Sequence, residues 1–308
     1  MKKDHLIALL LFFITFVSRY VFFEQDFGGF SYDSGSFALA VQSYDISQTR
    51  PHLPGYYLHI QSIKLLRLLT GDTHSAMKLL TLLYTSLAAG ILYLLLRRWF
   101  GRALSLLLYA LIFSNPLVWF YGCVTEIYAF DLFFGITLLG LGLSPRAIYA
   151  TPFFMGFFSG VRPSSAVLLL PLYIFLWYRQ IKSKKLSAPH VAAAHLVGIA
   201  GALLWVIPMI RSAGGLNQYL SLYSTNYPVE KISLLQNWYR FSSYFLFLII
   251  PCLVLFVYKI IQKYYRKNSR WQQGLPGIQN IPGEFTSLMF WWLIPPLLFF
   301  VFFHYSKG

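Results

Sequence analysis

The chain has 308 residues, of which 57% are hydrophobic and only 11% are charged, whereas about a quarter of the residues in an average soluble domain are charged. Because a soluble globule covers its surface with polar groups, this composition excludes an ordinary soluble enzyme, a disordered chain and a disulfide-linked secreted domain, and indicates a polytopic membrane protein. The formal net charge of +15 fits basic loops beside an anionic membrane surface, so we expect the lipid bilayer as partner and no nucleic acid.

The N-terminal segment is an apolar run from Leu6 to Phe23 that follows Lys2 and Lys3. It is long and lacks a small-residue cleavage pair, so it predicts a retained transmembrane helix rather than a signal peptide. The two lysines place the N-terminus in the cytoplasm, because cations flank the cytoplasmic ends of spans.

Eight further apolar runs predict membrane spans, which need about 17–25 residues each. They cover 77–96, 103–121, 124–143, 147–161, 164–178, 190–210, 241–260 and 286–303. Only Arg162 and Pro163 separate two short runs, which predicts a tight helical hairpin over 147–178. With the N-terminal helix, we expect about nine spans in a single transmembrane domain, residues 1–308.

The segment 55–69 is only half apolar and is a poor candidate for a span. Gln61, Lys64 and Arg67 are spaced by three and share one helical face. Because two cations would be costly at the bilayer centre, we predict an interfacial helix within a first extracytoplasmic loop, residues 24–76. With this topology most Lys and Arg residues face the cytoplasm, as the positive-inside rule requires.

The C-terminal part supports three further expectations. Residues 262–285 are rich in Lys, Arg, Gln, Gly and Pro and predict a cytoplasmic connector. The last span ends at the outer surface close to Gly308, so we expect a chain that continues past this residue, or a short member of a family that does. No Asn-x-Ser/Thr sequon occurs, which is compatible with a prokaryotic plasma membrane, with the endoplasmic reticulum as the alternative.

Polar residues that solubility does not require gather in the loop 24–76, where we therefore expect the chemistry. This loop holds five of the ten acidic residues and three of the seven histidines: Glu24, Asp26, Asp33, Asp45, Asp72, His52, His59 and His74.

Two motifs of this loop carry a family resemblance. Tyr-Asp-Ser-Gly at 32–35 and His-Leu-Pro-Gly-Tyr at 52–56 resemble the Asp-x-Gly-Glu and His-x-Pro-Gly-Tyr motifs of the GT-C superfamily of glycosyltransferases, in the branch of protein O-mannosyltransferases. Glu-Ile-Tyr-Ala at 126–129 is similar to the family's Glu-x-Tyr-Ala motif, and 160–164 is similar to a short outer turn. Ser36 stands where the family has Glu, which removes a second acid.

The resemblance implies an all-α, GT-C-like bundle of about nine transmembrane helices with interfacial helices in the first extracytoplasmic loop. It also implies a glycosyltransferase that moves a sugar, mannose in the family it resembles, from a polyprenyl-phosphate donor. The acceptor would be a hydroxyl of a protein, a lipid or a glycan, and the active site would lie on the extracytoplasmic face.

Transfer of a sugar from a lipid phosphate to a hydroxyl needs one base, and a single carboxylate suffices. The phosphate leaves without a general acid, but its charge needs cations or helix N-termini. We predict Asp33 as the base, with inversion at the anomeric carbon if the acceptor attacks opposite the phosphate. The alternative role of Asp33 is to cap a helix that begins near Gly35.

Six residues are candidates for substrate binding: His52, Tyr56, Glu126, Arg162, His304 and Lys307. Arg162 precedes Pro163, which favours the first turn of a helix, so a cation and a helix N-terminus would together attract an anion. Asp131 lies deeper in the same predicted span as Glu126 and should have a partner inside the bundle.

No cofactor is expected. One aspartate and scattered histidines do not define a metal coordination set, so no metal ligand is predicted and the need for a divalent ion stays open. His190 and His195 are five apart, a spacing that does not place two zinc ligands on one helical face.

Two other classes of function compete with a transferase. A transporter or lipid flippase could use Glu126, Asp131 and Arg162 as a polar pathway through the bundle. A non-catalytic relative is the other alternative, for which Ser36 in place of the family's Glu is the best argument.

Overall fold

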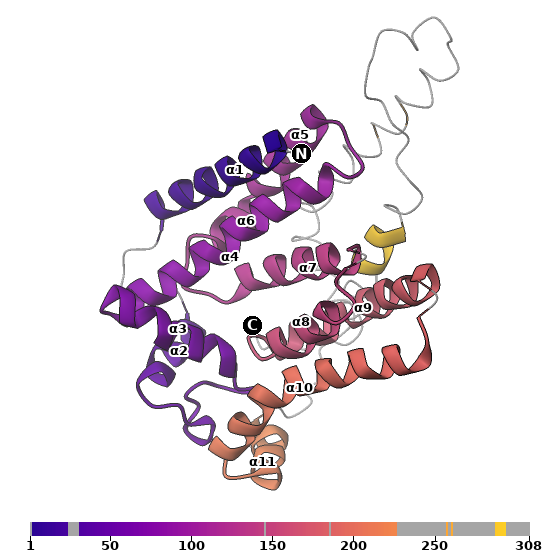
Figure 1. The fold of residues 1–308 in the computed structure, drawn as a ribbon. Coiled ribbons are helices and arrows are strands. Elements are labelled where there is room, and N and C mark those ends of the chain that lie inside the picture. Colours follow the sequence, from indigo (N-terminus) through magenta and orange to yellow (C-terminus); the bar gives the residue numbers. More distant parts are fainter. Residues whose placement is uncertain are drawn as a thin grey trace, which may run out of the picture.

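The computed structural model describes residues 2–23, 31–144, 146–184, 186–226 and 287–293, together with residues 257 and 260. In this part of the chain the regular structure is entirely helical, without a β-strand (Figure 1). The helices are α1 (Lys2–Val21), α2 (Tyr32–Gln42), a short 3-10 helix (Ile46–Gln48), α3 (Tyr57–Thr70), α4 (Thr73–Leu96), α5 (Arg102–Phe113), α6 (Pro116–Tyr121), α7 (Tyr128–Gly142), α8 (Ala150–Phe158), α9 (Pro163–Lys184), α10 (Ala188–Ser212) and α11 (Leu216–Asn226).

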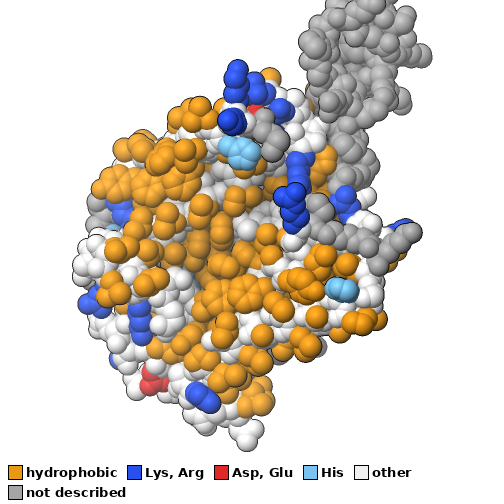
Figure 2. Space-filling model, in the orientation of Figure 1, with side chains coloured by type: hydrophobic (Ala, Val, Ile, Leu, Met, Phe, Trp, Pro, Cys, Tyr) orange, Lys and Arg blue, Asp and Glu red, His pale blue; other side chains and the backbone are white. Residues whose placement is uncertain are grey.

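Four of these helices, α1, α4, α9 and α10, are long and apolar enough to cross a membrane. Many of their apolar side chains face outward: Leu10 of α1 is 55% exposed and Leu204 of α10 is 59% exposed. Apolar side chains cover most of the face shown in Figure 2. Because a soluble monomer rarely exposes so large an apolar surface, these features agree with an all-α membrane protein.

The predicted span at 103–121 is wrong as a single helix. It breaks into α5 and α6 at Asn115 and Pro116. The side chain of Asn115 accepts a hydrogen bond from the Leu117 N–H at 3.0 Å and so caps α6, and proline lacks the N–H needed to continue α5.

The neighbouring runs also form shorter helices than expected. The run at 124–143 becomes helical only at Tyr128, and the run at 147–161 forms α8, which has 9 residues. Of the run at 241–260 the structure describes only residues 257 and 260, and of the run at 286–303 only residues 287–293, which are helical. The connector at 262–285 lies outside the described residues. The nine-span GT-C bundle therefore stays a prediction.

The expected hairpin over 147–178 does not form a packed pair. Although a short turn joins α8 to α9, α8 packs mainly against α10, and α9 packs against α7. Glycines explain the choice of partner, because a side chain at Gly156 would collide with the backbone carbonyl of Gly198. Small residues at a helix crossing let the two backbones approach closely.

The predicted helix in the segment 55–69 is present from Tyr57 onward and forms most of α3. Ile60 and Ile63 are fully buried where α3 packs against α4, whereas Leu65 and Leu68 are 66% and 82% exposed. An apolar outer face is the composition that lets a helix lie in the membrane interface. Its position relative to a bilayer stays a prediction.

Helix α4 is the centre of the bundle and contacts α1, α3 and α7. The chain reverses between α1 and α4, so the end of α1 and the start of α4 lie on the side of the molecule that α2 and α3 occupy (Figure 1). Glu126, in the turn before α7, accepts a hydrogen bond from Ser34 of α2 there. Arg162, in the turn before α9, pairs with Asp131 of α7. This end of the bundle holds the candidate site.

Candidate functional site

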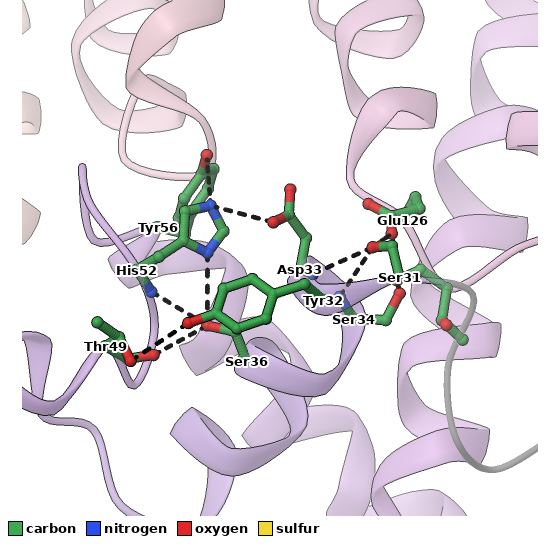
Figure 3. A network of polar contacts seen from close by, with 10 residues as sticks. Ser31, Tyr32, Asp33, Ser34, Ser36, Thr49, His52, Tyr56 and Glu126 are labelled. Atoms are coloured by element: carbon green, nitrogen blue, oxygen red, sulfur yellow. Dashed lines mark hydrogen bonds and ion pairs between the residues drawn. The ribbon is translucent and has the colours of Figure 1, made fainter. Parts of the chain in front are cut away.

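Five of the residues singled out from the sequence lie in one cluster: Asp33, His52, Tyr56, Glu126 and Arg162. They come from α2, from the loop between α2 and α3, and from the turns that precede α7 and α9. Figure 3 shows Asp33, His52, Tyr56 and Glu126. The charges of Asp33 and Arg162 both act on His52 and on Glu126, so the group is close enough to function as a unit.

Asp33 lies in the first turn of α2 but does not cap it. Helix α2 begins at Tyr32, and Ser31 is the cap, since its hydroxyl accepts a hydrogen bond from the Asp33 N–H at 3.1 Å. The expected cap near Gly35 is therefore wrong. The Asp33 carboxylate, 34% exposed, instead lies 3.6 Å from Nε2 of His52. An acid in the first turn is also favoured by the helix dipole.

Ser36 favours one neutral tautomer of His52. The Ser36 hydroxyl donates to the carbonyl of Thr49 at 3.0 Å and accepts from the His52 backbone N–H at 3.1 Å. The Ser36 hydroxyl proton is thus already donated to Thr49. The Ser36 oxygen lies 3.4 Å from Nδ1 of His52 and can only accept a hydrogen bond from that nitrogen. This contact favours the neutral tautomer with its proton on Nδ1, in which the Nε2 lone pair faces Asp33 and Tyr56.

Burial and charge keep His52 neutral. Burial lowers the pKa of His52, Asp33 raises it, and Arg162 lowers it further, so the pKa lies below its usual value. An unprotonated Nε2 can accept a proton from a neighbouring acid, which is the requirement for a proton relay.

Tyr56 completes this side of the site. Its hydroxyl lies 3.2 Å from Nε2 of His52, and it stands directly before α3 with a φ of 45°. Gly55 before it has a φ of 110°, a conformation that favours glycine, so this turn depends on a glycine. The fully buried ring of Phe37 lies under both aromatic groups, 5.6 Å from His52 and 5.1 Å from Tyr56 between ring centroids.

Glu126 is buried, only 3% exposed, and holds the start of α2. Its Oε1 accepts hydrogen bonds from the hydroxyl of Ser31 and, at 3.0 Å, from that of Ser34. Burial raises the pKa of Glu126, although these two hydrogen bonds lower it. Its Oε2 has no hydrogen-bond partner in the described part of the chain. These contacts tie Glu126 to the first turn of α2, which carries Asp33.

Removing the Glu126 side chain should destabilise the protein more than neutralising it. Glu126→Ala leaves the Ser31 hydroxyl without its acceptor and the Ser34 hydroxyl with only the Thr125 carbonyl, 3.3 Å away, which should cost about 1–3 kcal/mol. Glu126→Gln keeps an acceptor oxygen and should cost less than about 1 kcal/mol. Thermal unfolding in detergent measures both variants, and equal losses would contradict this role of Glu126.

Arg162 and Asp131 pair between α7 and α9. The Arg162 Nη1 donates to Oδ2 of Asp131, and the Ser165 hydroxyl donates to Oδ1. The guanidinium also lies 4.4 Å from the centroid of the Tyr128 ring. Arg162 is thus the partner that Asp131 was expected to have. Its Nε is buried and has no hydrogen-bond partner among the described residues.

His59 is a buried residue of this region that the sequence did not distinguish from an ordinary loop or helix histidine. It lies on α3 beside Phe37, at 4.9 Å between ring centroids, and is 4% exposed. Neither ring nitrogen has a hydrogen-bond partner within the described ranges, and burial lowers its pKa to about 3. His59 is therefore neutral in the folded protein.

This burial predicts a pH-dependent stability. Since the unfolded chain binds a proton near pH 6.5 and folded His59 binds it only near pH 3, the free energy of unfolding should fall by about 1.4 kcal/mol per pH unit below 6.5. His59→Leu should remove this part of the decline, whereas exposed His190→Gln should not. Melting temperatures between pH 4 and 8 check the prediction, and identical curves for His59→Leu and the wild type would contradict it.

The remaining predicted residues lie elsewhere. His304 and Lys307 fall outside the described residues. In the part of the chain that the structure describes, no three His, Cys, Asp or Glu side chains are grouped so that they could hold a metal ion. No protein-family model matches the sequence, and neither a curated protein nor a solved structure matches the chain significantly.

Proposed function

We propose that this protein is a membrane glycosyltransferase that moves a hexosyl group from a polyprenyl phosphate to an acceptor hydroxyl of a protein, lipid or glycan. The supporting observation is the arrangement of Asp33, a partly exposed carboxylate, beside the Nε2 lone pair of His52 and near Arg162. Together these groups provide a base, a proton acceptor and a cation at one end of a membrane bundle.

The reaction would begin with proton transfer from the acceptor hydroxyl to the Asp33 carboxylate. The acceptor oxygen attacks the anomeric carbon, and the bond from that carbon to the phosphate oxygen breaks, with its electron pair leaving on the phosphate. Attack opposite the leaving group inverts the anomeric carbon. Asp33 then passes the proton to Nε2 of His52, 3.6 Å away, and from there it reaches water.

Arg162 would balance the charge that develops on the phosphate. Its ion pair with Asp131 holds the guanidinium at the start of α9, where the helix dipole also favours an anion. The pair keeps a cation in place at the membrane surface without a mobile counterion.

The charge distribution supports an extracytoplasmic position for the site. Arg97, Arg98 and Arg102 lie between the end of α4 and the start of α5, at the opposite end of the bundle from Asp33. The positive-inside rule assigns such a basic end to the cytoplasm. The site would then face the periplasm or outer side of a prokaryotic plasma membrane, or the lumen of the endoplasmic reticulum.

Proteoliposomes that contain radiolabelled polyprenyl-phosphate hexoses test the proposal against a transporter. A glycosyltransferase moves the label to the acceptor and leaves unlabelled polyprenyl phosphate. A flippase moves the intact labelled lipid between leaflets. Flipping without transfer across several hexoses and acceptor classes would contradict the proposed function.

The neutral state of His52 predicts the pH dependence of transfer. Because His52 accepts the proton only when unprotonated, the transfer rate should rise with pH through a pKa below 6.5. His52→Gln should lower the rate by about 10- to 100-fold and remove this acid limb. Ser36→Ala removes the acceptor of the Nδ1 hydrogen and should lower the transfer rate by less than His52→Gln does. An acid limb that is unchanged in His52→Gln would contradict the relay.

A further inference from the structure

A basic cluster lies at the end of the bundle opposite the candidate site, where α1 begins, α4 ends and α5 begins. It consists of five cations and one acid: Lys2, Lys3, Asp4, Arg97, Arg98 and Arg102. Figure 2 shows Lys and Arg side chains gathered above the apolar surface at the end where Figure 1 places the N-terminus. The proposed transfer reaction uses none of these residues.

Asp4 holds two of the arginines side by side. Its Oδ1 accepts hydrogen bonds from Nε of Arg97 at 3.1 Å and from Nε and Nη2 of Arg102 at 3.3 Å. The Tyr93 hydroxyl donates to the same oxygen at 3.1 Å. One carboxylate cannot neutralise two guanidinium groups and three further cations, so the basic cluster keeps an excess of positive charge.

The basic cluster is accessible and directly adjoins apolar surface. The side chain of Arg102 is 48% exposed, and Arg98 is exposed beside it. One helical turn further along α1, Leu6 is 67% exposed, and Leu10 follows at 55%. Leu107 on α5 is 48% exposed. Cations thus lie at the rim of a surface whose apolar residues face outward.

We infer that the basic cluster binds the phosphate headgroup of an anionic glycerophospholipid, whose acyl chains lie along the exposed leucines of α1 and α5. Guanidinium groups bind phosphate oxygens through paired, charge-assisted hydrogen bonds. A free phosphate ion would contact only these cations. A phospholipid would in addition cover the exposed side chains of Leu6 and Leu107, so the apolar surface beside the cluster favours the lipid. Basic pockets between helices at a cytoplasmic membrane surface are suited to such headgroups. This inference does not depend on the proposed function.

Lipid binding to the purified full chain in neutral detergent tests this inference. Phosphatidylglycerol should bind in native mass spectra and raise the melting temperature, whereas phosphatidylcholine and inorganic phosphate at equal concentration should not. Near a membrane surface each cation is worth about 1 kcal/mol, or about fivefold in affinity. Arg98→Gln with Arg102→Gln should therefore weaken phosphatidylglycerol binding by about 10- to 30-fold.

The matched control removes two other surface cations, Lys64→Gln with Arg67→Gln on α3, and should change the affinity by less than about twofold. Equal binding of phosphatidylcholine would overturn the inference, and so would an equal loss in the control. If inorganic phosphate binds as well as the lipid, the cluster is an ion site and not a lipid site. The variant Lys2→Gln with Lys3→Gln should show the same loss of phosphatidylglycerol binding. It provides a second test if the arginine variant misfolds.

Discussion

Asp33→Asn should lower the rate of hexosyl transfer by about 100- to 10,000-fold, the range expected when a general base is removed. The variant keeps the size of the side chain but cannot take the proton of the acceptor hydroxyl. Its fold should be intact, because Ser31 and not Asp33 caps α2, and because the carboxylate is 34% exposed. Label transfer from a polyprenyl-phosphate hexose measures the loss.

Asp45→Asn is the matched control for this experiment. Asp45 lies in the same loop and caps the short 3-10 helix by accepting from the Ser47 N–H at 2.9 Å. Asparagine caps as well as aspartate, so transfer should change by less than about twofold. Similar rates in Asp33→Asn and Asp45→Asn would show that Asp33 is not the base.

Arg162→Leu should destabilise the protein by about 2–3 kcal/mol, because it leaves Asp131 without its counterion between α7 and α9. The loss is below the roughly 3–5 kcal/mol of a fully buried pair, since the Asp131 side chain is 36% exposed. Asp131→Leu should cost at least as much, because the Arg162 side chain it leaves unpaired is only 17% exposed. Thermal and denaturant unfolding in detergent measure both effects.

The double variant Arg162→Leu with Asp131→Leu separates the structural role of the pair from its role in transfer. Removing both charges should restore most of the lost stability, because an apolar pair of similar volume often replaces an ion pair without loss. Transfer should nevertheless stay at least about 100-fold below the wild type, because no cation then faces the leaving phosphate. Recovery of transfer together with stability would remove Arg162 from the mechanism.

The apolar pattern of the sequence was sufficient to predict α1, α4, α9 and α10, because a span needs only length and composition. It did not predict which helices pack together. The pairing of α8 with α10 depends on the fit between Gly156 and Gly198, which are far apart in the chain. Apolar residues lie on both sides of Asn115, so the apolar pattern alone predicted one span where the chain forms α5 and α6.

The grouping of the candidate residues was easier to predict than the helix packing, and their roles stay predictions. The motifs around Asp33, His52, Tyr56, Glu126 and Arg162 are each short, yet the folded chain brings all five residues together. The supporting residues could not be predicted, since their partners are set by tertiary structure. Ser165 meets Asp131 from another helix, and Ser36 contacts His52 across a loop. Ser31 alone had a local signal, as a serine directly before a helix.

The anomeric configuration of the product tests the central claim most directly. Wild-type protein, supplied with a polyprenyl-phosphate hexose of known configuration, should give an acceptor glycoside of the opposite configuration in a nuclear magnetic resonance spectrum. Asp33→Asn should give no such product on the same timescale. A product with retained configuration, or an inverted product formed equally fast by Asp33→Asn, would contradict single-displacement transfer with Asp33 as base.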